Sequence, residues 1–454
     1  MYDLGIIGGG PAGYTAAEHA AKVGFKVVIF EKADVGGVCL NEGCIPTKTL
    51  LYSAKLYQNA ITASKYGVSA ENVTFDYEKI IGRKNKVVRK LNAGIRAKLN
   101  HENILSVKGE AVVSGKNEKG IIVKCNEEEY DVRFLLICTG SHNIMPPIPG
   151  INPDTVWTSR EALQSKECPK SLVVIGGGVI GMEFAGFFNA LGVDVTVVEM
   201  QDEILGNMDK EISHILREEY MKKGIKFNMG SKVIELKDGE LFFEKEGNVE
   251  SVKADKVLLS IGRRASSQGI GLENLSVELL KNGGIVVDEH MQTAEPNVYA
   301  VGDVTGFSML AHTAVREAEV AVNHMHGEYD SMSYRAIPGV VYTNPEVAGV
   351  GETEESLQAK EIKYKALRLP MTFSGRFVAE NEGGSGLCKV LVGEDGHILG
   401  VHMIGNPSSE IITLATLAIE QNMTIEAWQK SVFPHPTVSE IIKETLFTLE
   451  SEHI

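Results

Sequence analysis

Short apolar runs that end in glycine-rich turns set the pattern of the first half of the chain. Residues 4–7 predict a buried strand, the turn 8–13 (Gly-Gly-Gly-Pro-Ala-Gly) follows, and an alanine-rich segment with helical spacing comes next. Residues 26–30 predict a second strand. The same succession recurs, with strands predicted at 173–175 and 194–198. This alternation predicts an α/β fold with two Rossmann-like dinucleotide-binding domains.

The two copies of this plan share one spacing. Gly176 lies 168 positions after Gly8, and Glu199 lies 168 positions after Glu31. In each copy the first glycine makes the turn, the second lets a pyrophosphate approach the backbone, and the third lets the helix pack on the strand. The pyrophosphate is expected at the helix N-terminus, with the acid accepting hydrogen bonds from ribose hydroxyls. The glycines with these expected roles are Gly8, Gly10, Gly13, Gly176, Gly178 and Gly181.

Glu199 also predicts a cofactor preference. A carboxylate at this position repels a 2′-phosphate, so the second site is expected to prefer NAD over NADP. The alternative for Glu31 and Glu199 is a solvated strand end that binds nothing.

Cys39 and Cys44 lie five positions apart and form a candidate redox pair. A disulfide requires Cα atoms about 4.4–6.8 Å apart, so a loop or a distorted helical turn is expected here. Pro46 suits a first helical turn, and apolar residues then recur at helical spacing as far as Ile61. Cys44 is therefore expected just ahead of a helix N-terminus, where the dipole and the free N–H groups favour a thiolate.

A structural disulfide and half of a metal site are the alternatives for this pair. No second cysteine pair or histidine cluster at ligand spacing follows in the sequence, so no metal is expected. Nothing else in the sequence is typical of a secreted protein, which disfavours a purely structural bridge. The four other cysteines occur singly and are interpreted as ordinary thiols.

Length and charge exclude several classes of protein. The chain has 454 residues, which is too long for one hydrophobic core. Its net charge of −15 disfavours nucleic-acid binding. The sequence has neither a membrane-length apolar stretch nor a basic segment after Met1, so a cytoplasmic protein is expected.

His435 and Glu440 are a candidate acid/base pair near the C-terminus. A histidine titrates near neutral pH and can take a proton from a thiol, while a carboxylate can hold its second ring nitrogen. A histidine between two prolines, as here, is by itself more often a surface turn residue.

Together these motifs resemble the pyridine nucleotide-disulfide oxidoreductase family, and most closely its members that oxidise dihydrolipoamide. The resemblance covers essentially the whole chain. The further motifs that carry it are Ile137-Cys138-Thr139-Gly140-Ser141, Ile261-Gly262-Arg263-Arg264, Val301-Gly302-Asp303 and residues 435–440.

The resemblance implies roles for particular residues around FAD. Glu31 is expected on the ribose of FAD, and Asp303 near the ribityl chain and phosphates, with Thr139, Gly140 and Gly262 in motifs of the same sites. Cys44 is implied as the thiol against the flavin, and Cys39 as the interchange thiol that attacks substrate. Lys48 is implied near flavin N5, paired with Glu183. His312 lies in a family-like context, but no chemical role is assigned to it.

The expected domain organisation follows the change of pattern along the chain. The divisions are an FAD-binding domain over 1–147, an NAD-binding domain over 148–268 with a small antiparallel insertion around 227–256, a central domain over 269–337 and an interface domain over 338–454. Within the central domain, strands are expected at 284–287 and 297–300. The pattern of the last domain predicts antiparallel strands with a turn at 394–396, followed by a helix over 408–421. The resemblance makes it a dimerisation domain of α+β type. No lipoyl domain is visible in the sequence, so a lipoyl carrier is expected on a separate chain.

These observations predict a homodimeric FAD flavoprotein that oxidises protein-bound dihydrolipoamide and reduces NAD+. The alternatives are an NADH-dependent reductase of another low-molecular-weight disulfide and a non-catalytic subunit of a complex. Mercuric reductase is disfavoured because no cysteine follows Cys388. One departure from the family pattern is Phe433, which stands where a histidine is common.

Overall fold

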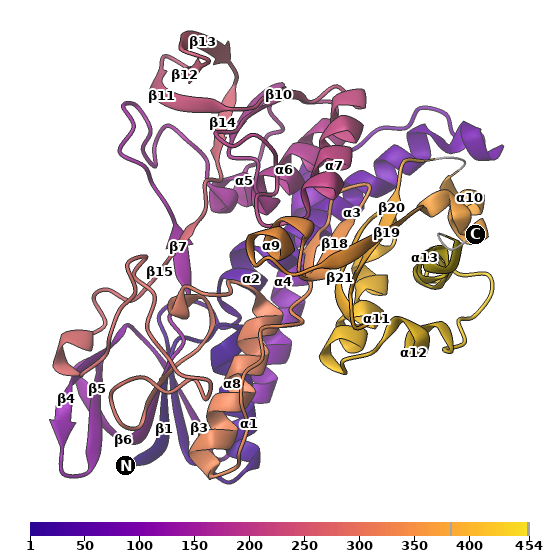
Figure 1. Ribbon diagram of the computed structural model, residues 1–454. Coiled ribbons are helices and arrows are strands. Elements are labelled where there is room, and N and C mark those ends of the chain that lie inside the picture. Colours follow the sequence, from indigo (N-terminus) through magenta and orange to yellow (C-terminus); the bar gives the residue numbers. More distant parts are fainter. Residues whose placement is uncertain (382–383, 452–454) are drawn as a thin grey trace.

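The first glycine loop belongs to a seven-stranded sheet in the N-terminal half of the molecule (Figure 1). The computed structural model describes residues 1–381 and 384–451. The strands of this sheet are β1 (Tyr2–Ile7), β2 (Val27–Glu31), β3 (Ile104–Lys108), β4 (Ala111–Asn117), β5 (Gly120–Cys125), β6 (Glu128–Ile137) and β16 (Val298–Ala300). β1, β2, β3, β6 and β16 run parallel, and β4, β5 and β6 form an antiparallel meander. Segments from both ends of the first 300 residues therefore build one sheet.

Three helices cover this sheet, namely α1 (Pro11–Lys22), α4 (Tyr77–Leu99) and α8 (Ala311–His326). α1 and α8 lie side by side and pack through alanines, which allow a close approach. The strand expected at 284–287 is wrong: Ile285 makes an isolated bridge to Leu279. A Cβ at Gly284 would lie 2.2 Å from the Thr305 carbonyl oxygen, and the Ile285 N–H donates to the Val304 carbonyl oxygen at 2.9 Å, so this segment lies against a neighbouring turn.

The second glycine loop belongs to a four-stranded parallel sheet in the order β10-β9-β8-β14. Its strands are β8 (Ser171–Ile175), β9 (Asp194–Val198), β10 (Lys226–Asn228) and β14 (Lys256–Leu259), and its helices are α5 (Ser159–Gln164), α6 (Val179–Ala190) and α7 (Lys210–Lys222). The expected antiparallel insertion is β11 (Ser231–Lys237), β12 (Glu240–Lys245) and β13 (Asn248–Lys253). A two-stranded ribbon of β7 (Ser141–Asn143) and β15 (Arg263–Ala265) connects the two nucleotide-binding halves (Figure 1).

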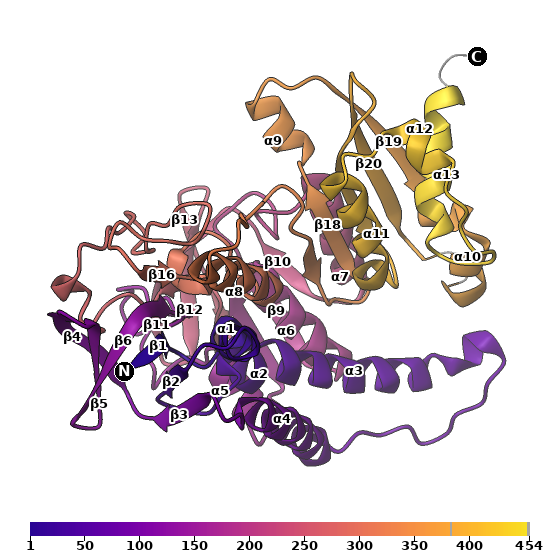
Figure 2. The same cartoon turned by 90° about the horizontal axis from the view of Figure 1, so that it is seen from below.

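The C-terminal part forms a separate antiparallel sheet with its own core (Figure 2). Its strands are β17 (Gly339–Val341), β18 (Val347–Gly351), β19 (Tyr364–Pro370), β20 (Leu387–Gly393) and β21 (Ile398–Ile404). Its helices are α9 (Glu354–Ala359), α10 (Gly375–Asn381), α11 (Ser408–Glu420), α12 (Ile425–Gln429) and α13 (Glu440–Ser451). The predicted turn at 394–396 joins β20 to β21, and α11 matches the helix predicted at 408–421. Within the described residues, none of the helices combines the length and the apolar composition needed to cross a membrane.

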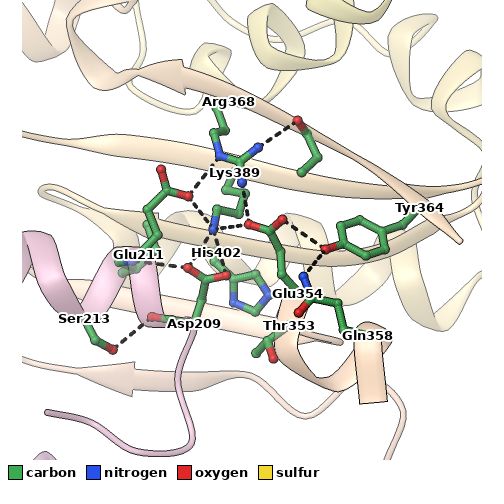
Figure 3. A network of polar contacts seen from close by, with 12 residues as sticks. Asp209, Glu211, Ser213, Thr353, Glu354, Gln358, Tyr364, Arg368, Lys389 and His402 are labelled. Carbon is green, nitrogen blue, oxygen red and sulfur yellow. Dashed lines mark hydrogen bonds and ion pairs between the residues drawn. The ribbon is translucent and has the colours of Figure 1, made fainter. Parts of the chain in front are cut away.

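A buried ionic cluster joins this C-terminal sheet to the second nucleotide-binding half (Figure 3). Lys389 Nζ on β20 lies 2.8 and 2.9 Å from the two carboxylate oxygens of Asp209, which caps the start of α7. The ammonium also lies 2.6 Å from Glu211 Oε2 and 2.8 Å from Glu354 Oε1. Arg368 bridges the same two glutamates. Burial lowers the pKa of Lys389, but these carboxylates outweigh it and the pKa is raised, so the lysine stays charged.

We expect Lys389→Met to destabilise the protein by about 3–5 kcal/mol, because it leaves the fully buried Asp209 carboxylate without its cation. The shift of the urea unfolding midpoint measures this effect. Lys363→Met is the matched control, since Lys363 pairs with Glu394 on the exposed surface of the same sheet. Equal shifts of the unfolding midpoint in the two variants would mean that burial of the Lys389 ion pairs has no special effect on stability.

Candidate active site

A break between two helices brings Cys39 and Cys44 together. Cys39 lies in α2 (Gly37–Glu42), and Cys44 is the first residue of α3 (Cys44–Ile61). Between the helices Gly43 has φ −144° and ψ −108°, and a Cβ there would lie 3.0 Å from the Val38 carbonyl oxygen. The predicted distorted helical turn is thus confirmed. Within the described residues the pair is present as two unlinked thiols.

The two thiols differ electrostatically. A hydrogen bond from the Cys39 thiol lowers the pKa of Cys44 to about 7; burial opposes this effect and the nearby Lys48 ammonium reinforces it. The pKa of Cys39 is raised, because its proton is held in that hydrogen bond and its surroundings are buried. Cys44 is therefore the thiol that ionises first, as expected at the start of a helix.

Lys48 and Glu183 form a tight ion pair beside Cys44. Lys48 lies one turn after Cys44 on α3, and its Nζ donates to both oxygens of Glu183 at 2.8 Å. Glu183 lies on α6, just after the second glycine loop, and its side chain is 4% exposed. The backbone N–H of Tyr342, just after β17, donates to Glu183 Oε1 at 3.0 Å. Three separate parts of the fold therefore meet at one carboxylate.

The turn that leads into α2 is held by two asparagines that the sequence analysis did not single out. Asn41 Nδ2 donates to the carbonyl oxygens of Val35 and Gly37, at 3.1 and 3.0 Å. Asn92 on α4 donates to Val35 O at 2.7 Å and to Asn41 Oδ1 at 3.1 Å. The position of Asn41 between the two cysteines could have marked it as a candidate from the sequence alone. For Asn92, 51 residues away, the sequence carries none.

Both glycine loops have the geometry of a pyrophosphate cradle. Gly8 and Gly176 have φ of +106° and +99°, and a Cβ at either would press against a neighbouring carbonyl. Gly13 and Gly181 allow the helix to approach the loop, since a Cβ there would lie 1.9 and 2.1 Å from the carbonyl oxygen of the first glycine.

The second glycine of each loop is less crowded than the first and the third. A Cβ added at Gly10 would lie 3.8 Å from the Gly37 Cα, which is an ordinary van der Waals distance. A Cβ added at Gly178 would have no neighbouring group of the described residues within 4 Å. Among the described residues, no side chain caps α1 or α6, so their first N–H groups are available. The two loops therefore fit the phosphates of two dinucleotides.

The two acids occupy equivalent positions. Glu31 accepts N–H hydrogen bonds from Gly9 at 2.7 Å and Ala33 at 2.8 Å. Glu199 accepts them from Gly177 at 2.5 Å and from Gln201 at 2.7 Å. A carboxylate has about four acceptor positions, so each can still bind a pair of ribose hydroxyls. The repeat found in the sequence is thus also a repeat of hydrogen bonds.

The remaining cofactor candidates gather around the β7–β15 ribbon. Asp303 accepts a 2.5 Å hydrogen bond from Ser141, and Arg263 donates to the same hydroxyl at 2.7 Å. The Thr139 hydroxyl donates to the Ser266 carbonyl oxygen at 2.7 Å, and the Ser266 N–H donates to the Gly140 carbonyl oxygen at 2.9 Å. Gly262, with φ +116°, immediately precedes β15. The ribbon therefore ties the expected flavin side to the second nucleotide-binding half.

His435 and Glu440 pair with each other at the start of α13. His435 Nδ1 lies 3.0 Å from Glu440 Oε1, and the Thr437 N–H donates to Glu440 Oε2 at 2.7 Å. These two contacts, the backbone one first, lower the pKa of Glu440 and keep it ionised. The His435 side chain is 80% exposed, and α13 lies well away from α2 in both views (Figures 1 and 2). Phe433 packs against the core of this domain, and the His312 side chain, at the start of α8, is exposed.

Two family models match the chain. The model described as pyridine nucleotide-disulphide oxidoreductase matches residues 2–318, and the model of its dimerisation domain matches residues 337–446. The chain belongs to this family. The second model agrees with the expected dimerisation domain, and the protein is accordingly a homodimer.

Curated relatives match over almost the whole chain. It is 38% identical to a dihydrolipoyl dehydrogenase of Bacillus subtilis, with 100% of this chain and 99% of the relative covered. It is 36% identical to that of Mycoplasma genitalium, with 98% and 97% covered.

Solved structures match as well. The HOCl-induced flavoprotein disulfide reductase RclA of Escherichia coli superposes with a TM-score of 0.86 at 27% identity, covering 98% of this chain and 99% of RclA. LpdA of Mycobacterium tuberculosis, at 24% identity and a TM-score of 0.90, covers 98% of this chain and 99% of its own, and supports the fold.

We predict that the ionisation of Cys44 depends on the proton donor at position 39. Cys39→Ser keeps a hydroxyl donor, whereas Cys39→Ala removes it and raises the midpoint of Cys44 by about one pH unit, since a hydrogen bond to a charged group contributes about 1.5–3 kcal/mol. The lowered pKa means that the thiolate persists down to about pH 7 and is protonated below it. Ultraviolet absorbance of the thiolate against pH measures the midpoint, with the corresponding Cys44→Ser double variant as the blank. The same midpoint in both variants would contradict this role of Cys39.

Proposed function

We propose that the protein has dihydrolipoyl dehydrogenase activity: it oxidises dihydrolipoamide carried by a separate lipoylated protein and reduces NAD+. The observation that carries this proposal is the pair Cys39–Cys44, with its one acidic thiol, set beside Lys48 and between two dinucleotide cradles. Similarity to curated dihydrolipoyl dehydrogenases over the full length supports the same activity.

FAD and NAD are the cofactors of this family, and the cradles fit both. Glu31, Asp303, Thr139 and Gly140 would hold FAD at the first loop. Glu199 and Gly262 would hold NAD at the second loop. When bound, FAD supplies a two-electron acceptor and NAD+ the final hydride acceptor.

The protein residues carry out the thiol exchange. His435, oriented by Glu440, accepts the proton of one dihydrolipoyl thiol. The resulting thiolate attacks the Cys39 sulfur of the oxidised pair, and the S–S bond breaks with its electrons on Cys44. The second lipoyl thiol then attacks the lipoyl sulfur bound to Cys39, and its proton passes to the departing Cys39 thiolate. This closes the lipoyl disulfide and leaves Cys39 as a thiol and Cys44 as a thiolate. A low pKa suits Cys44 to this step, because a more acidic thiol leaves faster.

His435 is proposed to serve the partner subunit. Its exposure, and its place on a domain that matches the family's dimerisation domain, support a two-fold dimer in which each active site combines Cys44 of one chain with His435 of the other.

The second candidate function is reduction of another low-molecular-weight disulfide at the expense of NADH. The similarity to the flavoprotein disulfide reductase RclA favours it. The higher identity to dihydrolipoyl dehydrogenases weighs against it.

Steady-state assays separate the two functions and test the second cradle. We expect turnover of dihydrolipoamide with NAD+, and a kcat/KM at least tenfold lower with NADP+, because Glu199 repels a 2′-phosphate. Oxidation of NADH by glutathione disulfide is the control reaction and should be slow. Faster turnover of glutathione disulfide than of lipoamide would favour the second function, and comparable values for the two nucleotides would contradict the role of Glu199.

The shared site predicts complementation between two inactive variants. Cys44→Ser and His435→Ala subunits are combined in equal amounts and allowed to exchange at random, so that half of the dimers are heterodimers. Each heterodimer has one complete site of two. About a quarter of wild-type lipoamide turnover should therefore return. Mass spectrometry checks that heterodimers have formed. Absence of recovery in confirmed heterodimers would mean that His435 serves its own chain.

A further inference from the structure

Lys48 has two electrostatic partners that compete for it. Its ammonium is bound to both oxygens of Glu183, yet it also lowers the pKa of Cys44, while Glu183 acts in the opposite sense. The benefit to Cys44 depends on distance, because a Coulomb interaction weakens as the charge moves away and becomes hydrated. The lysine side chain is 29% exposed and has four rotatable carbons, so its position needs a restraint besides Glu183.

Tyr342 contacts both members of this pair. Its ring lies 4.5 Å from Lys48 Nζ, within the range of a cation–π interaction, and its backbone N–H donates to Glu183. Burial, and then Glu183, raise the pKa of the Tyr342 hydroxyl, so the ring carries no negative charge that would compete for the ammonium. β17 and its pairing with β18 fix the backbone at this point.

We propose that Tyr342 is a positioning residue, whose ring holds the Lys48 ammonium close to Cys44 and shields it from water. This inference rests on Cys44 as the acidic thiol of the proposed function. It assigns to the interface domain a part in tuning the redox pair of its own chain, in addition to the His435 that it is proposed to supply to the partner's site.

The groups that face Cys44 come from several elements. They are Cys39 on α2, Lys48 on α3, Glu183 on α6, Tyr14 on α1, Arg263 on β15 and Tyr342 after β17. Of these, Lys48 and Arg263 are cationic, and Lys48 is the one in contact with the Tyr342 ring. Loss of the ring should therefore act through Lys48.

The test is the ionisation midpoint of Cys44 in the Cys39→Ser background, measured by ultraviolet thiolate absorbance with the Cys44→Ser blank. Tyr342→Leu keeps the backbone N–H but removes the ring, and should raise the midpoint by about half a unit, which lowers the thiolate fraction about threefold at a pH below it. Tyr342→Phe keeps the ring and should leave the midpoint unchanged. In a Lys48→Met background, Tyr342→Leu should have no further effect.

Tyr52→Leu is the matched control. Tyr52 lies one turn after Lys48 on α3, and its ring faces a different cation, Arg83, at 5.7 Å. It should not move the midpoint. If Tyr342→Leu does not fold, pentafluorophenylalanine at position 342 keeps the shape of the ring, reverses its quadrupole and should raise the midpoint relative to phenylalanine.

An unchanged midpoint in Tyr342→Leu or in the fluorinated variant would overturn the inference, as would a shift that persists in the Lys48→Met background. The readout needs neither lipoamide nor NAD+. Failure of the proposed activity would therefore appear in the turnover assays and leave this measurement intact.

Discussion

The ion pair between Lys48 and Glu183 is the contact on which the arrangement of the active site depends. Glu183 is almost fully buried, so it requires a cation and hydrogen-bond donors in fixed positions. The cation comes from α3 in the first half and the backbone donor from Tyr342 at the start of the C-terminal sheet, while the carboxylate itself lies on α6 in the second half. Satisfying one carboxylate therefore brings α3, α6 and the segment after β17 together beside Cys44.

A second buried ion pair, between Lys389 and Asp209, connects the second nucleotide-binding half to the C-terminal sheet. Lys389 is 1% exposed and holds Asp209, the cap of α7, against the C-terminal sheet. From α7, Tyr220 donates to the Met182 carbonyl next to Glu183, and its ring packs where Gly186 leaves room. Helix α7 is thus held at its start by the C-terminal sheet and near its end by α6. The cluster around Lys389 compensates charges buried between α7 and the C-terminal sheet, whereas the pair at Lys48 lies beside Cys44.

The parts of this structure that the sequence could predict are those set by local geometry. Glycine turns, the acids that follow them and a cysteine at a helix start all act over a few residues, and the structure has each in place. Tyr342, Lys389 and Asn92 act across 51 to 180 residues, where the pattern of a single sequence carries no distance information. One local pattern misled: the run at 284–287 is apolar, but it lies against a neighbouring turn and forms no strand.

The duplicated halves diverge a few residues after the acid that closes each cradle. In both, the chain returns to the glycine loop and donates a backbone N–H to it: Gly36 to the Gly9 carbonyl at 2.7 Å, and Leu205 to the Gly177 carbonyl at 3.0 Å. From this shared point the first copy runs into α2 and the redox cysteines, and the second runs to Asp209 and α7. The same place in the repeated unit therefore leads to the candidate redox cysteines in one copy and to the attachment to the C-terminal sheet in the other. This explains how two nearly identical cradles support different tasks: the cradle fixes a dinucleotide, and the segment inserted behind it decides what that dinucleotide meets.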